Sequence, residues 1–169
     1  KECVRLDFDD KAKFQGLIAG ADILVEDFAP SSSHQKLVER DALAKINPRL
    51  INCSITAYGK RGPLKDEPPL DDLVLARMGV LGGLPGFRPA PVHLVHPLPS
   101  VGAAVLAGLG IAAAVLARES TGRGRAVETS LMAGALLYHP KVAADHLEPH
   151  DFQTHPSGSA PFYSIYQCS

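Results

Sequence analysis

The chain has 169 residues, of which 46% are hydrophobic and 21% charged, and its formal net charge is −1. That length suffices for one domain with a hydrophobic core. Because the net charge is close to zero, we do not expect an electrostatic field that attracts nucleic acid. The three widely spaced cysteines fit neither a disulfide framework nor a zinc ribbon, which favours a reducing, cytoplasmic setting.

The first sixty residues alternate between strand-like and helix-like segments. The apolar runs predict strands at 3–8, 22–28 and 49–59. Helix-like segments separate them: "DDKAKFQGLIAG" ends at a glycine, and a run of three serines can cap the next helix. This alternation predicts an α/β fold, namely a Rossmann-like parallel sheet with flanking helices.

Parallel sheets of this kind bind ligands beyond the carboxyl ends of their strands. In this chain those ends are residues 8–10, 26–33 and 56–62. The second combines an aromatic residue, a proline turn and three serines at a helix start, where free N–H groups suit a phosphate. The third adds Lys60 and Arg61 beside a glycine turn.

An apolar run, "VGAAVLAGLGIAAAVLA", covers residues 101–117. Its length is at the lower limit for a membrane span, its composition is mostly Ala and Gly, and it lacks aromatic anchors. We therefore expect a buried core helix rather than a membrane-spanning one. Pro99 suits the first turn of that helix, and Ser100 could cap it.

Two groups of residues invite a catalytic or metal-binding interpretation that the spacing does not support. The histidines at 139, 146, 150 and 155 are not joined by a carboxylate or cysteine into a tetrahedral set, and Pro149 breaks the helical spacing of the middle pair. We expect no metal site. The pair Asp71 and Asp72 could do acid–base chemistry, but its position favours a solvated helix start.

Four segments in order resemble the CaiB/BaiF family, the class III CoA-transferases, which includes formyl-CoA transferase and alpha-methylacyl-CoA racemase. They are "ADILVEDFAP", "LAKINPRLINCSITAYGKRGP", "LDDLVLARMGVL" and "GLGIAAAVLARESTGRGRAVETSL", and together they cover nearly the whole chain. The resemblance implies that residues 1–140 are part of a Rossmann-like CoA-binding large domain. Residues 141–169 would be a connector toward a missing small domain, so we expect a fragment.

The resemblance also implies the ligand and the assembly. Coenzyme A or acyl-CoA would be a substrate, with no covalently bound cofactor, and the full-length protein would be an interlocked homodimer or a pseudo-dimer without a membrane partner. Asp27 and Phe28 fall where family members place a pair of residues against CoA, and Gln35 and Lys36 fall near its nucleotide end. The turn Thr56, Ala57, Tyr58 and Gly59 completes the expected contacts.

The family places its catalytic aspartate just ahead of the glycine-rich helix, and that position falls at Pro99 or Ser100 here. No acid occurs between Pro85 and Arg118. Ser100 and His96 are the nearby candidates for a replacement. The sequence therefore leaves three functions open: a CoA-transferase-like protein that moves CoA between carboxylic acids, a noncatalytic CoA-binding or structural half, and an acyl-CoA racemase type of activity.

Overall fold

A parallel three-stranded sheet forms the centre of the computed structural model, which describes residues 2–83, 93–138, 158–160 and 163–164. Its strands are β1 (Ile23–Glu26), β2 (Ile51–Thr56) and β3 (Ala126–Ser130), in the order β1-β2-β3. Cys53 in the buried middle strand is in register with Val25 on one side and Val127 on the other. The expected parallel sheet is confirmed.

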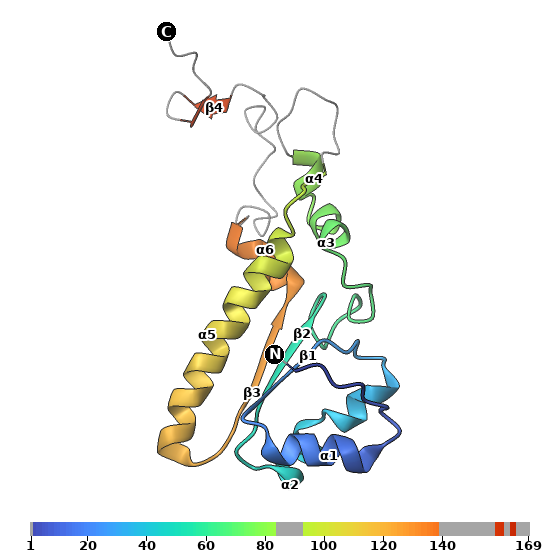
Figure 1. The fold of residues 1–169 in the computed structure, drawn as a ribbon. Coiled ribbons are helices and arrows are strands. Elements are labelled where there is room, and N and C mark those ends of the chain that lie inside the picture. The colour runs from blue at the N-terminus through green and yellow to red at the C-terminus, as the bar shows by residue number, and fades with distance from the viewer. Residues whose placement is uncertain (1, 84–92, 139–157, 161–162, 165–169) are drawn as a thin grey trace.

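Helices lie on both sides of this sheet. They are α1 (Lys11–Gly20), the 3-10 helix η1 (Ser33–Leu37), α2 (Arg40–Ile46), α3 (Asp71–Arg77), α4 (Val80–Gly83), α5 (Leu98–Thr121) and α6 (Leu131–Tyr138). Figure 1 shows α5 on one side of the sheet, with α1 and α2 on the other. Two further strands, β4 (Gly158–Ala160) and β5 (Tyr163–Ser164), form a separate antiparallel pair.

The strand predicted at residues 3–8 is wrong. Residues 2–7 have no regular structure and lead into a turn before α1, which Asp10 caps by accepting a hydrogen bond from the Lys13 N–H. Among the described strands, β1 pairs only with β2, so this segment is not hydrogen-bonded to the free edge of β1 as a strand. Leu6 and Phe8 instead pack against the apolar cluster beneath α1. The alternating apolar side chains of this segment therefore pack on the protein, although its backbone does not form the hydrogen bonds of a strand.

Two apolar clusters hold the helices in place. One lies between α1, α2 and the sheet and contains Phe14, Ile18, Val38, Leu43 and Leu50. The other lies where α3, α4, α5 and α6 meet and contains Val74, Leu75, Val80, Ala103, Leu131 and Ala135. The second cluster joins α3 to α5, although the two helices are far apart in sequence.

Small residues let α5 pack closely on its neighbours. A Cβ at Gly102 would overlap the backbone of Gly134 in α6, so the two helices touch backbone to backbone there. Gly110 similarly leaves room for the side chain of Val127 in β3. The helix begins at Leu98 and ends at Thr121, longer at both ends than the apolar run 101–117, and Gly122 closes it in the left-handed conformation at φ 67°.

The long helix α5 meets the length and hydropathy criteria for a membrane span, with a mean hydropathy of 2.2 over the tested window. One helix of this kind is weak evidence for a membrane, because core helices meet the same criteria. The expectation of a buried core helix is wrong for most of α5, because only 22% of that window is buried among the described residues. One side of α5 packs on β3 and α6, and the other exposes Val105, Leu109 and Leu116.

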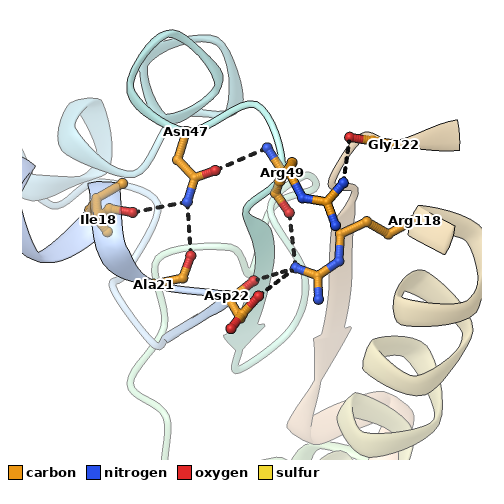
Figure 2. A network of polar contacts seen from close by, with 7 residues as sticks. All are labelled: Ile18, Ala21, Asp22, Asn47, Arg49, Arg118 and Gly122. Carbon is orange, nitrogen blue, oxygen red and sulfur yellow. Dashed lines mark hydrogen bonds and ion pairs between the residues drawn. The ribbon is translucent and has the colours of Figure 1, made fainter.

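Two parts of the segments that resemble the family, "NPRLI" and "RESTGRG", meet at the amino ends of the strands (Figure 2). Arg118, which is buried near the end of α5, donates from Nη1 to the Asp22 carboxylate at 3.1 Å and to the Arg49 carbonyl at 3.2 Å. The Asn47 amide donates to the carbonyls of Ile18 and Ala21 at 3.1 and 2.8 Å. These motif residues therefore have a structural role, at the end of the sheet away from the carboxyl ends of its strands.

Candidate functional site

The loop after β1 is held by its own side chains. Glu26 is buried, and its Oε2 accepts a hydrogen bond from the Phe28 N–H at 2.9 Å. The Gln35 side-chain amide donates to the Phe28 carbonyl at 2.8 Å, so its nitrogen faces the loop. Asp27 and Lys36, also expected to contact CoA, are exposed and available to a ligand.

The ring of Phe28 belongs to an aromatic group with Phe8 and His34. The Phe8 and Phe28 rings meet edge to face at a centroid distance of 5.4 Å, and the Phe8 and His34 rings lie 4.6 Å apart. Beside this group is an open hollow of about 530 Å³ that Arg5, Lys13 and His34 help to line. This aromatic group was not predicted from the sequence, because Phe8 was assigned to a strand.

The loop after β2 is a tight turn whose residues are mostly engaged within the protein. The Thr56 Oγ1 accepts a hydrogen bond from the Gly59 N–H at 2.9 Å, and Gly59 has φ 96°, which a side chain would disfavour. The Ala57 carbonyl accepts from the Met132 N–H at 3.0 Å, which ties the turn to α6. Burial raises the pKa of the Tyr58 phenol, and nearby Arg77 lowers it by a smaller amount.

Lys60, which follows β2, contacts the last residue of β1 and the middle residue of β3. Its Nζ lies 3.6 Å from the Glu26 Oε1, within ion-pair distance but too far for a hydrogen bond. Its backbone N–H donates to the Glu128 Oε1 at 3.2 Å. The expected CoA residues after β1 and after β2 therefore lie at one edge of the sheet, on neighbouring strands. Their contact with CoA stays a prediction.

The first turn of α5 holds a carboxylate that comes from α3. Both Asp71 oxygens accept hydrogen bonds from Ser100: Oδ1 from the backbone N–H at 2.7 Å and Oδ2 from the hydroxyl at 2.8 Å. Pro99 is fully buried, and Asp71 and Ser100 are half-buried. Because the first N–H groups of a helix have no intrahelical acceptor, Asp71 satisfies one of them. Ser100, which the sequence suggested as a possible cap, is instead the donor in this contact.

The two neighbouring aspartates have different surroundings. Asp71 lies three and four residues before the buried Val74 and Leu75, on the inward face of α3. Asp72 is exposed and its Oδ2 lies 2.9 Å from the Nδ1 of His93. The interpretation as a solvated helix start therefore fits Asp72 and not Asp71. The spacing of three and four residues between Asp71 and the apolar Val74 and Leu75 was the signal in the sequence that could have distinguished the two acids.

The structure gives little support to the remaining candidate residues from the sequence. His96 is exposed. The histidines at 139, 146, 150 and 155 and the connector residues 141–157 lie outside the described residues. Within the described ranges, no three His, Cys, Asp or Glu side chains come together as possible metal ligands.

The chain matches the model of "CoA-transferase family III" over residues 1–169. It is 36% identical to the acetyl-CoA:oxalate CoA-transferase of Acetobacter aceti, over 78% of this chain and 34% of that protein. It is also 36% identical to the beta subunit of the succinyl-CoA–L-malate CoA-transferase of Chloroflexus aurantiacus, over 70% of this chain and 29% of that subunit. The chain thus spans about a third of the length of these relatives.

Solved structures show the same fold. Rv3272 from Mycobacterium tuberculosis superposes with a TM-score of 0.75 at 27% identity, covering 86% of this chain and 42% of that one. A CaiB/BaiF family protein from Brucella suis superposes with a TM-score of 0.70 at 26% identity, covering 85% of this chain and 40% of that one.

Proposed function

Since the chain belongs to CoA-transferase family III, we propose that the full-length protein transfers coenzyme A between carboxylic acids. The observation that carries this proposal is the family match over the whole chain, and the transferase relatives support it. Residues 1–140 would be part of the CoA-binding domain, and residues 141–169 would connect it to a second domain.

We place the CoA site at the carboxyl edge of the sheet, over the loops after β1 and β2. Parallel α/β sheets bind ligands at this edge. CoA carries phosphates, and the exposed Lys36 and the partly exposed Lys60 are cations beside the two loops. Phe28 and Gln35 would shape the first loop, and residues 56–59 the second, while Asp27 would lie at the rim.

The assembly is proposed as an interlocked homodimer or a pseudo-dimer in a cytoplasmic setting. The succinyl-CoA–L-malate CoA-transferase relatives carry the names of an alpha and a beta subunit, which supports association of two family chains.

Titration calorimetry of the full-length protein with CoA and with acetyl-CoA tests the binding site. The Lys36→Ala variant should bind CoA about three- to tenfold more weakly, because a charge-assisted contact to a phosphate is lost. Lys45→Ala is the matched control, since Lys45 is an exposed lysine in the last turn of α2. Absence of heat with either ligand at millimolar concentration would contradict the proposal.

Exchange of labelled CoA between an acyl-CoA and a free carboxylic acid tests the activity. Net formation of the second acyl-CoA is expected. Binding without exchange would favour a noncatalytic CoA-binding half, and loss of stereochemistry at the α-carbon without exchange would favour a racemase.

A further inference from the structure

We propose that a second hollow, at the amino ends of the strands, binds a small oxyanion that carries an O–H donor of its own. The hollow has a volume of about 390 Å³ and lies between α2 and the starts of β2 and β3. Small-molecule sites usually have volumes of about 300–1,000 Å³. Figure 1 shows α2 and the start of β3 at the end of the sheet opposite α3 and α6, so this site is separate from the proposed CoA loops.

Cations dominate the charged side chains of this hollow. Three arginines and one acid line it: Arg40, Arg123, Arg125 and Asp41. Among the described residues, none of the three arginines forms an ion pair. A guanidinium group binds the oxygens of a carboxylate or a phosphate through paired N–H donors. The lining therefore favours an anion that has several oxygens.

A buried amide in the wall adds a second requirement. Asn52 lines the hollow and is only 7% exposed, and its Nδ2 donates to the Val38 carbonyl at 3.1 Å. Its Oδ1 is buried and has no hydrogen-bond partner among the described residues. Because Nδ2 is turned toward Val38, Oδ1 is the amide atom left for the hollow. A buried acceptor without a donor is costly, so a ligand that donates an O–H to Oδ1 would be favoured.

Asn47 lines the same hollow and offers a comparison, because both ends of its amide are engaged within the protein. Its Nδ2 donates to the carbonyls of Ile18 and Ala21. Its Oδ1 accepts the Arg49 N–H at 3.0 Å (Figure 2). Asn47 therefore holds the wall in place, whereas Asn52 keeps an acceptor for a ligand.

The backbone fixes the base of two of the arginines. A Cβ at Gly124 would overlap the backbone of Leu50, so the chain before β3 runs directly against the start of β2. The Asn52 N–H also donates to the Arg125 carbonyl at 3.0 Å. Arg123 and Arg125 flank this close approach on either side of the glycine. The site is therefore built on two paired strands, which position binding groups more precisely than a loop does.

Two kinds of ligand share the required chemistry. At neutral pH, phosphate has charged oxygens and at least one O–H group, and a hydroxycarboxylate has a carboxylate and a hydroxyl. Sulfate and unsubstituted dicarboxylates have the charge but no O–H group. Phosphate with sulfate, and L-malate with succinate, are therefore two pairs of probes that differ mainly in the donor.

Titration calorimetry of the full-length protein at neutral pH compares the four probes. We expect phosphate or L-malate to bind at least about tenfold more tightly than its partner without the O–H group, because only the hydroxyl member satisfies the Asn52 Oδ1. Tighter binding of phosphate would identify a phosphate-type ligand, and tighter binding of malate a hydroxycarboxylate. No binding of any probe at millimolar concentration would overturn the site, and equal affinities within both pairs would overturn the requirement for a donor.

Variants locate the bound anion. Arg125→Gln should weaken binding of the preferred probe about tenfold. Arg61→Gln is the matched control, since Arg61 is an exposed arginine in the loop after β2, and it should bind the probe like the wild type. The opposite pattern would place the anion at the carboxyl edge of the sheet and overturn the assignment.

Asn52→Ala should reduce the preference for the hydroxyl member of the pair to within about threefold. An unchanged preference would show that Oδ1 does not receive the ligand's O–H group. If Asn52→Ala does not fold, the wild-type preference together with Arg125→Gln decides. Arg125→Gln should still bind CoA like the wild type, so failure of this inference is distinguishable from failure of the proposed transferase function.

Discussion

Arg118 and Asp22 join the last turn of α5 to the residue before β1, with 3.1 Å between Nη1 and Oδ1. The same nitrogen also lies within hydrogen-bond distance of the carbonyls of Asp22 and Arg49, at 3.4 and 3.2 Å. Asp22 is largely exposed, whereas Arg118 is buried. The carbonyl contacts therefore matter more for stability than the ion pair.

Replacing Arg118 with Ala should lower the free energy of unfolding by roughly 1–3 kcal/mol, because the part-buried contacts to two backbone carbonyls lose a charged donor. Urea denaturation measures the change. Arg77→Ala is the control, since its ion pair with Glu67 is partly exposed and should contribute less than about 1 kcal/mol. Equal losses of unfolding free energy for the two variants would show that the contacts of Arg118 contribute no more than a partly exposed ion pair.

Ser100→Ala should lower the free energy of unfolding by about 1 kcal/mol, because the hydroxyl no longer donates to the Asp71 Oδ2 while the backbone N–H still holds Oδ1. Urea denaturation measures the change. Ser100→Thr keeps a hydroxyl and should recover most of the stability. An unchanged free energy of unfolding for Ser100→Ala would show that the hydroxyl does not help to hold α3 against α5.

Gly102→Ala should destabilise the protein by more than about 2 kcal/mol, because the added methyl overlaps the backbone of Gly134. Gly108→Ala on the same helix meets no atom within 4 Å and should stabilise by up to about 1 kcal/mol, since Ala favours helix. Thermal unfolding of both variants measures the difference. Loss of stability in both would contradict the close approach of α5 and α6.

Burial raises the pKa of the Cys53 thiol, and the Glu26 carboxylate raises it further. The folded state therefore holds this proton more tightly than the unfolded state. The resulting stability is fully present below the ordinary thiol pKa of 9.0 and is lost as the pH rises above it. Unfolding measured from pH 7 to 10.5 should show this loss, and Cys53→Ala should reduce it.

Iodoacetamide mapping is the companion measurement, because exposed Cys3 should react in the native state while buried Cys53 should not. Rapid modification of Cys53 would contradict its burial.

Residues 1–169 expressed alone should bind a hydrophobic dye, because Val105, Leu109 and Leu116 leave an apolar stripe on the outer side of α5. The double variant Leu109→Lys, Leu116→Glu should bind less dye. Dye fluorescence and light scattering measure the outcome, and a monodisperse wild-type chain without dye binding would contradict it.

The sequence predicted the features that depend on local periodicity. The strands β1 and β2 and the helix α5 lie within or around the predicted ranges, because apolar spacing and glycine or proline boundaries define them. The strand at residues 3–8 was wrong, since a strand requires a partner that periodicity cannot specify. The aromatic group around Phe8 was missed for the same reason.

The contact between Asp71 and Ser100 could not be read from the sequence, because it depends on the packing of two helices rather than on spacing along the chain. No acid lies close to Ser100 in sequence, although the Asp71 carboxylate lies beside it in space. The inward spacing of Asp71 before Val74 and Leu75 was a local clue, but it did not specify which helix would lie opposite.

The helix α5 carries Ser100 in its first turn and Arg118 in its last, about 27 Å apart at 1.5 Å per residue. A helix of this length transmits a tilt at one end as a displacement at the other. A relative with a different residue opposite Arg118 would therefore shift the first turn of α5, and with it the contact between Ser100 and Asp71. A substitution at the amino ends of the strands would then change the packing of α3 on α5 at the opposite end of the helix.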